Sequence, residues 1–356
     1  MRITFLLPSD NLTGGARVVA VHARGLAALG HEVLVVTCAP DAPHWRERLR
    51  RTLGRSRAGG GPSQGHIALS GVAHKVMARQ GPITADDVPD ADFIVATWWE
   101  TAVWMHAMPA SKGRKVHLIQ GYEIWQGADQ VPKVHAALLL PNIKITISRD
   151  LKQTIERALG PLGIELVPNA VDPDQFDAPP RKRQAPPVVG FVYAHARIKG
   201  ADICAEACER ARAVLPDLRV LAFGADRPNA QVPLPKGAVF FHRPEQDQLR
   251  THYAACDVWL FGSRLDSFGL PILEAMACRT PVIAVPVGAA TDLLSDGAGC
   301  LVAPESPQAM ADALVRICQQ PEAEWQRMSD RAHAVAHAYT WRDATTLLLD
   351  ILKRSS

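Results

Sequence analysis

The sequence predicts two α/β domains in tandem, each built on a doubly wound parallel sheet. The chain has 356 residues, about twice the usual length of a single domain. Nearly continuous apolar runs, such as Glu32–Thr37 and Val188–Val192, are typical of strands buried on both faces of a parallel sheet. A proline-rich, charged stretch without periodicity, residues 177–187, separates two series of alternating strands and helices, as a linker does.

The first series predicts a domain over residues 1–176. It opens with an apolar strand from Met1 that stops at Pro8, and a polar turn leads to a helix over 16–29. That helix ends at Gly30, where a left-handed residue is commonly required. The later strands of this domain are predicted at Glu32–Thr37, Phe93–Thr97, Lys115–Ile119, Ile143–Ile147 and Ile164–Pro168.

The second series predicts a domain over residues 188–339. Its expected elements are strand Val188–Val192, helix Ala201–Val214, strand Arg219–Phe223, a short strand near Val239, helix Gln246–Ala255 and strand Val258–Phe261. Ligands of such sheets bind beyond the carboxyl ends of the strands, so tandem domains of this kind are expected to enclose a cleft.

Composition and charge narrow the functional classes. The net charge is +3, and no dense Lys/Arg run with interleaved aromatic residues occurs, so nucleic acid is not an expected partner. Seven scattered cysteines include no Cys-x-x-Cys pair, which favours a reducing, cytoplasmic location. The first apolar run is too short for a signal peptide, and no run approaches the roughly 18 apolar residues of a membrane span.

Residues 44–57 raise the question of a membrane surface. Trp45, Leu49 and Leu53 recur every four residues among arginines. This pattern fits a basic amphipathic segment that contacts an anionic membrane peripherally. The alternative is a surface helix beside the cleft, and both interpretations stay open.

The stretch from Asp266 to Ile283 is the most informative for chemistry. Pro271 suits the first turn of a helix, so the loop Phe268-Gly269-Leu270 would bring backbone N–H groups and a helix N-terminus to one place. Such a place attracts anions and suits a diphosphate. Asp266 and Glu274, on either side, could accept hydrogen bonds from sugar hydroxyls. The alternative is an ordinary strand-loop-helix with two unremarkable acids.

This stretch resembles the signature of the GT-B retaining glycosyltransferases of the family 4 type (glycosyl transferases group 1), an acid-x7-acid pattern around Phe-Gly-Leu-Pro-x-Leu-Glu-Ala-Met-Ala-Cys. Further likeness lies in Gly14-Gly15, Gly30–Val33, Asn169–Asp172, Phe176, Gly288, Asp296–Val302 and Tyr339–Trp341. The resemblance implies two Rossmann-like domains facing across a cleft, with a C-terminal helix (340–356) that crosses back to the first domain. It also implies retaining transfer from a nucleotide-diphosphate sugar without metal or cofactor.

Residue roles follow from the resemblance. Lys199, Arg197 and the Phe268–Leu270 amides would stabilise the leaving diphosphate, Glu274 would hold the ribose and Asp266 the transferred sugar. The chain departs from the family at three positions. Asp266 replaces the usual Glu, Arg279 replaces a Gly, and Ala194 stands where the family has an arginine. Arg197 is the candidate substitute for that arginine.

Other positions complete the predicted site. Gly14 and Gly15 would let the first domain approach the donor, while His242 and Arg243 either flank the base or are structural. The acceptor-side candidates follow predicted strands of the first domain and are Trp98, Trp99, Glu100, Gln120, Tyr122 and Glu123. Aromatic rings there suit stacking on a sugar, although packing against neighbouring helices accounts for the two tryptophans equally well.

No metal site is predicted. Asp90 and Asp92 form an Asp-x-Asp pair that leads straight into a strand, and no other ligand is visible. His333 and His337 have helical metal-ligand spacing but lack a third ligand, which favours satisfied or solvated histidines. The expected partners are a nucleotide-sugar donor and a saccharide or lipid-linked acceptor, as in synthesis of a cell-surface polysaccharide.

Two rival functions differ in what they require. A nicotinamide-dependent oxidoreductase needs a Gly-x-Gly-x-x-Gly turn after the first strand, and the turn here is Thr13-Gly14-Gly15-Ala16. A non-catalytic nucleotide-sugar binding protein of the same fold remains an alternative because of Ala194. Turnover of a donor separates this alternative from the enzyme.

Overall fold

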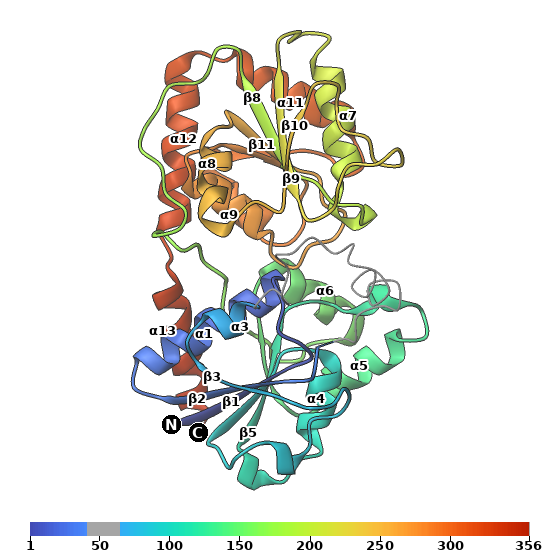
Figure 1. The fold of residues 1–356 in the computed structure, drawn as a ribbon, viewed down its shortest axis with the longest axis vertical. Helices are drawn as coiled ribbons and strands as arrows, with labels where there is room; N and C mark the ends of the chain where they lie inside the picture. The colour runs from blue at the N-terminus through green and yellow to red at the C-terminus, as the bar shows by residue number, and fades with distance from the viewer. Residues whose placement is uncertain (41–64, 356) are drawn as a thin grey trace, which may run out of the picture. The chain divides into compact units, whose positions relative to one another are not determined.

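The computed structural model describes residues 1–40 and 65–355. The basic amphipathic segment 44–57 therefore lies outside the described residues. The chain divides into two compact units (Figure 1). Unit 1 comprises Met1–Ile147, Lys152–Val167 and Ala344–Ser356, and unit 2 comprises Ser148–Leu151 and Pro168–Asp343.

Unit 1 is built on a seven-stranded parallel sheet with the order β3-β2-β1-β4-β5-β6-β7. The strands are β1 (Arg2–Leu7), β2 (Glu32–Thr37), β3 (Ala73–Val76), β4 (Phe93–Ala96), β5 (Arg114–Ile119), β6 (Ile143–Thr146) and β7 (Glu165–Leu166). The chain starts in the middle of the sheet, winds out to β3 and returns beside β1 as β4. The strand order therefore reverses between β1 and β4, where sheets of this kind bind ligands.

Unit 2 repeats this plan with six parallel strands in the order β10-β9-β8-β11-β12-β13. They are β8 (Val188–Val192), β9 (Arg219–Gly224), β10 (Val239–His242), β11 (Val258–Phe261), β12 (Val282–Ala284) and β13 (Gly299–Leu301). Numbered within the unit, this is the 3-2-1-4-5-6 order of dinucleotide-binding sheets. Its switch point lies between β8 and β11. Two doubly wound α/β units are thus confirmed.

Helices alternate with the strands in both units. The first unit contains α1 (Gly14–Ala28), α3 (His66–Leu69), α4 (Trp99–His106), α5 (Val131–Leu139) and most of α6 (Arg149–Leu159). The second contains α7 (Ala201–Ala211), α8 (Leu249–Ala254), α9 (Leu270–Ala277), α10 (Ala290–Leu293), α11 (Pro307–Gln319) and α12 (Glu322–His337). None of the described helices is long and apolar enough to cross a membrane.

The last helix, α13 (Trp341–Arg354), returns the chain to unit 1 from Ala344 onward. It packs on α1, where the Thr345 hydroxyl lies 3.3 Å from Nδ1 of the buried His22. A Cβ added at Gly25 would lie 2.8 Å from Thr345 Oγ1. Glycine at this position therefore allows α13 to pack closely on α1. Burial lowers the pKa of His22 to about 4, so this contact is made by a neutral ring.

The predicted linker is attached to unit 2 by its side chains and amides. Arg181 pairs with the fully buried Asp257 at 2.8 Å and stacks over the Trp325 ring at 4.8 Å. The amides of Gln184 and Val188 donate to the same carboxylate at 3.0 and 2.8 Å. A proline-rich, charged composition therefore does not make this segment loose, because its polar groups find partners in the unit.

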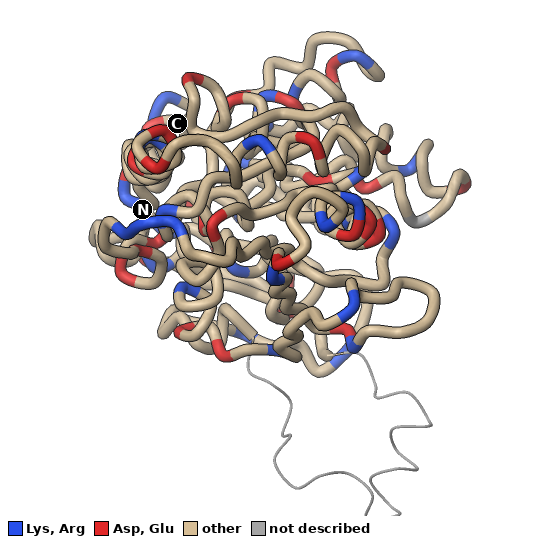
Figure 2. The backbone as a smooth tube through the Cα atoms, turned by 90° about the horizontal axis from the view of Figure 1, so that it is seen from above, with Lys and Arg blue, Asp and Glu red and all other residues tan. Residues whose placement is uncertain are grey.

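Acidic and basic residues are interspersed along the chain. Figure 2 shows short blue and red segments alternating over the described backbone seen from above. This distribution agrees with the small net charge of +3.

Candidate functional site

The switch point of unit 2 carries a charged pair. A 3-10 turn, η4 (Arg197–Lys199), follows β8, and a loop follows its neighbour β11. From these two places Lys199 Nζ donates to Asp266 Oδ2 at 2.8 Å. The Lys199 side chain is 43% exposed and that of Asp266 15% exposed. The two residues that the sequence singled out, 67 positions apart, are thus in contact.

The loop before α9 is shaped by the other oxygen of Asp266. Asp266 Oδ1 accepts hydrogen bonds from the amides of Phe268 (3.2 Å) and Gly269 (2.8 Å). Gly269 has φ +88°, and a Cβ there would lie 3.0 Å from Ile272 Cδ1, so glycine is needed for this turn. Two of the three amides expected to bind a diphosphate therefore bind Asp266 instead. Leu270 begins α9, where first-turn amides have no acceptor within the helix.

Gly288 supports the same loop from its far side. A Cβ at Gly288 would lie 2.8 Å from the Phe268 carbonyl oxygen, and its φ is +61°. That carbonyl accepts a hydrogen bond from the Ala289 amide at 2.8 Å. The glycine noted in the sequence therefore allows the backbone approach that holds the Phe268–Leu270 loop.

Glu274 lies on α9 and is 7% exposed. The Tyr253 hydroxyl on α8 donates to Glu274 Oε2 at 2.7 Å. Tyr253 is itself fixed among aromatic rings, with Trp259 at 4.5 Å and Phe223 at 5.4 Å between centroids. Tyr253 thus orients the carboxylate, a role that the sequence did not indicate because Tyr253 sits inside a predicted helix.

Arg264 holds the η4 turn in place. Its guanidinium donates to the Arg197 carbonyl at 2.7 Å, to Asp202 at 2.8 Å through two nitrogens, and pairs with Glu305 at 2.6 Å. The hydrogen bonds to Asp202, and secondarily those to Glu305, raise the pKa of Arg264 well above its ordinary range. Sequence reasoning missed Arg264, since no motif marks an arginine that binds a backbone carbonyl.

Gly200, the residue after η4, also helps to hold this turn in place. It has φ +63°, and a Cβ would lie 1.8 Å from the Gly262 carbonyl oxygen. Only glycine therefore lets the turn after β8 pack on the loop after β11. Arg197 presents an exposed side chain in the same turn, and within the described residues no ion pair of that side chain is found.

His242 and Arg243 lie at the end of β10, two strands away from β8. His242 Nε2 lies 3.1 Å and Arg243 Nε 3.3 Å from the same acceptor, the Ala225 carbonyl oxygen. The Arg243 amide also donates to the Gly224 carbonyl at 2.9 Å. These contacts fix the chain after β9, as the structural alternative for this pair requires.

Near the switch point of unit 1, a glycine predicted on the donor side lies beside an acceptor-side candidate. Gly14 and Gly15 open α1 after β1, and Gln120 follows β5. A Cβ at Gly15 would lie 3.6 Å from Gln120 Oε1, which is an ordinary contact. Gln120 Oε1 is buried and has no hydrogen-bond partner among the described residues. An unsatisfied acceptor at a switch point suits a ligand that donates a hydrogen bond.

Glu123 is a buried carboxyl beside the first turn of α4. It is 3% exposed, and its Oε2 accepts a hydrogen bond from the Trp99 amide at 3.0 Å. Burial, with a smaller contribution from nearby Glu100, raises the pKa of Glu123 to about 8. The group is therefore mostly protonated near pH 7 and carries a donor hydrogen. Glu100 lies half-buried in the same turn.

Aromatic residues lie close to Glu123 in the sequence, and some of their rings contact one another. Trp98 meets Trp125 edge to face at 5.9 Å, and Trp125 is 46% exposed. The Tyr122 hydroxyl lies 2.6 Å from His135 Nε2, with the two rings nearly parallel. Trp125 and His135 were missed, since neither directly follows a predicted strand.

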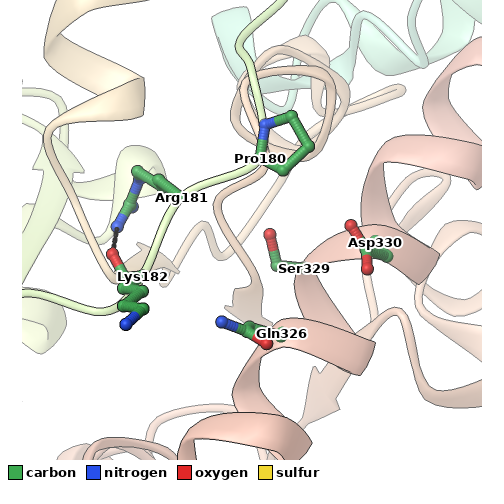
Figure 3. Close-up of a pocket in the computed structure, with 6 residues that line it drawn as sticks. All are labelled: Pro180, Arg181, Lys182, Gln326, Ser329 and Asp330. Carbon is green, nitrogen blue, oxygen red and sulfur yellow. Dashed lines mark hydrogen bonds between the residues drawn. The ribbon is translucent and has the colours of Figure 1, made fainter.

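Two further places hold polar groups outside these sites. A pocket is lined by Pro180, Arg181, Lys182, Gln326, Ser329 and Asp330, from the linker and α12 (Figure 3). None of the predicted site residues lines it.

The Asp-x-Asp pair has structural partners, because Asp90 pairs with Lys112 at 3.0 Å and Asp92 accepts from the Arg2 amide at 2.7 Å.

One cluster of potential metal ligands exists in the described part of the chain. It consists of Asp177, His333 and His337, whose ligand atoms lie within 4.8 Å of one another. The structure thus places a carboxylate beside the two histidines, which the sequence did not indicate.

Comparison with known proteins finds a family match within the second unit. Residues 186–320 match the family model described as glycosyl transferases group 1. D-inositol 3-phosphate glycosyltransferases from Corynebacterium urealyticum and Xylanimonas cellulosilytica are 32% and 31% identical over 183 and 220 residues. These matches cover 47% and 54% of this chain and 42% and 52% of the relatives. The matched stretch thus spans about half of each relative.

Solved structures match over the whole chain at low identity. Sucrose-phosphate synthase from Thermosynechococcus elongatus has a TM-score of 0.71 at 19% identity, covering 100% of this chain and 99% of that one. Anabaena HepE, solved with UDP-glucose, has a TM-score of 0.72 at 18% identity, with the same coverage. At this identity the likeness establishes the fold. Residues 186–320 are therefore similar to the glycosyl transferases group 1 family, and the two units have the GT-B fold.

Proposed function

We propose that the protein is a retaining, metal-independent glycosyltransferase that transfers a glycosyl group from a nucleotide-diphosphate sugar to a glycan, a lipid-linked glycan or another acceptor. The observation that carries this proposal is the Lys199–Asp266 pair at the switch point of unit 2, beside the N-terminus of α9. The family match supports glycosyl transfer in general, and the site's chemistry supports the finer statement.

Breaking the glycosidic bond leaves negative charge on the diphosphate, and the site offers positive charge where it is needed. Lys199 Nζ has three donor hydrogens and uses one for Asp266, so two remain for phosphate oxygens. The N-terminus of α9 adds a partial positive charge. Because Arg264 and Gly200 fix the turn that carries Lys199, the charge is in place before the reaction begins. Retention then follows from front-face attack or a short-lived ion pair.

The two acids of the motif are suited to holding hydroxyl groups. Tyr253 orients Glu274 through one oxygen, which fits a carboxylate that binds the ribose. Asp266 accepts three hydrogen bonds, and a carboxylate has about four acceptor positions. One position therefore remains for a hydroxyl of the transferred sugar.

Unit 1 supplies the acceptor side in this proposal. Trp98, the exposed Trp125 and the protonated carboxyl of Glu123 together offer apolar rings and a hydrogen-bond donor. Sugar rings and polyols combine an apolar face with hydroxyl groups, and this combination suits such a surface. Because related proteins are named for transfer to D-inositol 3-phosphate, inositol phosphates belong in the acceptor panel.

A cytoplasmic location, with peripheral contact through residues 44–57 to the cytoplasmic face of a membrane, forms part of the same proposal. Its support is the basic amphipathic pattern of those residues. Flotation with anionic vesicles tests it. Deletion of 44–57 should abolish binding to anionic vesicles, and binding that survives the deletion would contradict it.

The test begins with a thermal-shift screen of the full chain against UDP, GDP, dTDP, ADP and CDP and their common sugar conjugates. A ligand that binds only the folded state raises the melting temperature. UDP-sugars are tested first, since HepE was solved with UDP-glucose. Each hit is then incubated with acceptor, and NMR of the product reports whether the anomeric configuration is retained. Inversion would contradict the retaining mechanism.

A non-catalytic nucleotide-sugar binding protein is the second candidate. Ala194 at the position of the family arginine and the use of the Phe268 and Gly269 amides by Asp266 favour it. Single-turnover measurement with saturating protein decides between the two. Donor binding with neither transfer nor donor hydrolysis would establish the second candidate.

A further inference from the structure

Three side chains from distant parts of the sequence converge at the end of α12. His333 and His337 lie one helical turn apart on α12, with ring centroids 4.1 Å apart. Asp177, 156 positions before His333, reaches the same place from the segment after Phe176. Asp177 Oδ1 lies 2.8 Å from His333 Nε2 and 3.8 Å from His337 Nε2.

The contacts of His337 indicate which of its two ring nitrogens carries the hydrogen. Its Nδ1 lies 2.9 Å from the His333 carbonyl oxygen. A carbonyl only accepts, so Nδ1 carries the hydrogen, and in the neutral ring Nε2 keeps a lone pair. That Nε2 is buried and has no hydrogen-bond partner among the described residues. An imidazole held through one nitrogen by a backbone carbonyl, with the other nitrogen bare, is the usual arrangement of a metal-ligating histidine.

His333 is also prepared for ligation. The neutral ring donates its Nε2 hydrogen to Asp177 Oδ1. A metal ion could take the place of this hydrogen, with the ring adopting the Nδ1–H tautomer. Arg279, a cation near this ring, is paired with Asp330 and donates to the Ala178 carbonyl.

We propose that Asp177, His333 and His337 bind one Zn²⁺ ion, with water as the fourth ligand. Two imidazoles and a carboxylate suit zinc, whereas Mg²⁺ and Ca²⁺ prefer oxygen ligands. Tetrahedral ligands about 2.05 Å from zinc lie about 3.3 Å apart, between the 2.8 and 3.8 Å separations of the unbound site. All three ligand atoms lie within 4.8 Å of one another, so side-chain rotations would bring them onto one ion.

The ion would have a structural effect within unit 2. Asp177 lies shortly after the chain enters this unit and His337 shortly before it leaves. Zinc would strengthen the link between these two segments, which already share the hydrogen bond between His333 and Asp177 and a β-bridge between Val171 and Thr340. None of the three ligands belongs to the predicted donor site, so the ion is expected to change stability and not transfer.

The experiment uses the full, untagged chain stripped of metal. Isothermal titration with ZnCl₂ at pH 7.5 should show one zinc per chain, and Asp177→Asn and His337→Gln should each weaken this binding at least tenfold. His106→Gln, a half-buried histidine of α4, is the matched control and should bind as the parent does. Circular dichroism verifies that each variant is folded.

Two further measurements keep the test independent of any single variant. Zinc should raise the melting temperature of the parent more than that of His337→Gln, while Mg²⁺ should raise neither. Zinc binding should also fall sharply at pH 5.5, because protonated imidazole does not ligate. Absence of a stoichiometric zinc site in the parent, or equal binding by the parent and both ligand variants, would overturn the proposal.

Discussion

Unit 1 and unit 2 can be compared strand by strand, because both sheets wind outward from a central strand and return beside it. At the switch point of unit 2 the chain places a partly exposed ion pair, Lys199 with Asp266. At that of unit 1 it places tryptophans and a buried carboxyl, Glu123. The same topology thus presents charge in one unit and apolar surface in the other. The function of such a sheet is set by the loops after its strands.

The two units also differ in how each accommodates a buried carboxyl group. Asp257 in unit 2 is fully buried and receives Arg181 and two amides. Glu123 in unit 1 receives one amide and, among the described residues, no ion pair, and its pKa rises to about 8. A buried carboxyl thus either acquires a cation or takes up a proton. Variants of these carboxyl groups and of the switch-point residues would test both differences between the units.

The largest expected effect is on the stability of unit 2. Arg181→Ala leaves Asp257 buried without its cation, which should cost about 3–5 kcal/mol of unfolding free energy. Urea denaturation measures the change. Lys182→Ala, an exposed neighbour, should stay within about 0.5 kcal/mol of the parent. Equal effects of the two variants would show that the Asp257 pair has no special importance.

The second effect concerns catalysis at the charged switch point. Lys199→Ala should lower kcat by about 10²–10³-fold, as loss of a group that stabilises transition-state charge does. Initial rates at saturating donor measure this loss. Lys236→Ala, an exposed lysine of the same unit, is the control and should transfer normally. A Lys199→Ala variant with near-parental kcat would remove Lys199 from the proposed mechanism.

The third prediction concerns pH and the uncharged switch point. The pKa of Glu123 is about 8 in the folded chain against an ordinary value of 4.5. The stability contributed by its neutral form is therefore complete below about pH 4.5 and is lost as the pH rises through 8. Glu123→Gln keeps an acceptor for the Trp99 amide but cannot ionise. The variant should gain on the order of a few kcal/mol relative to the parent between pH 5 and 8.5.

Urea denaturation across that pH range measures the gain. Glu165→Gln changes an exposed glutamate of the same unit and should show no such trend. A constant difference between Glu123→Gln and the parent at every pH would contradict the raised pKa.

A smaller effect is expected at Arg279, which replaces the family's usual glycine. Arg279 keeps a left-handed backbone with φ +59°, and its side chain binds the Ala178 carbonyl and Asp330. Arg279→Ala and Arg279→Gly both lose these contacts, but only alanine retains the backbone strain. The alanine variant should be less stable by about 1 kcal/mol. Equal melting temperatures would show that the backbone relaxes.

No change in rate is expected on removal of metal. Treatment with a chelator should leave transfer at 25 °C unchanged, because Lys199 and the α9 N-terminus provide the positive charge in the proposed mechanism. Chelation should nevertheless lower the melting temperature of zinc-loaded protein if Asp177, His333 and His337 hold the ion. A large loss of rate that added Mg²⁺ or Mn²⁺ restores would contradict metal independence.

Much of the architecture was predictable from local patterns. Apolar runs such as Glu32–Thr37 and Val188–Val192 are strands in the structure with the same bounds, because buried parallel strands require apolar residues on both faces. Edge strands lack this signal. β3 (Ala73–Val76) is mostly exposed, so its four residues show neither an apolar run nor alternation, and it was not predicted.

By itself the sequence determined the two-unit α/β plan and the turn-helix segment that carries Asp266 and Glu274, since strand periodicity and this motif are encoded in neighbouring residues. Only the tertiary structure decided which distant groups meet. It set Lys199 on Asp266, Tyr253 on Glu274, Arg264 on the η4 turn and Asp177 beside two histidines. These contacts depend on strand order and helix packing, which join residues tens to hundreds of positions apart and leave no local pattern.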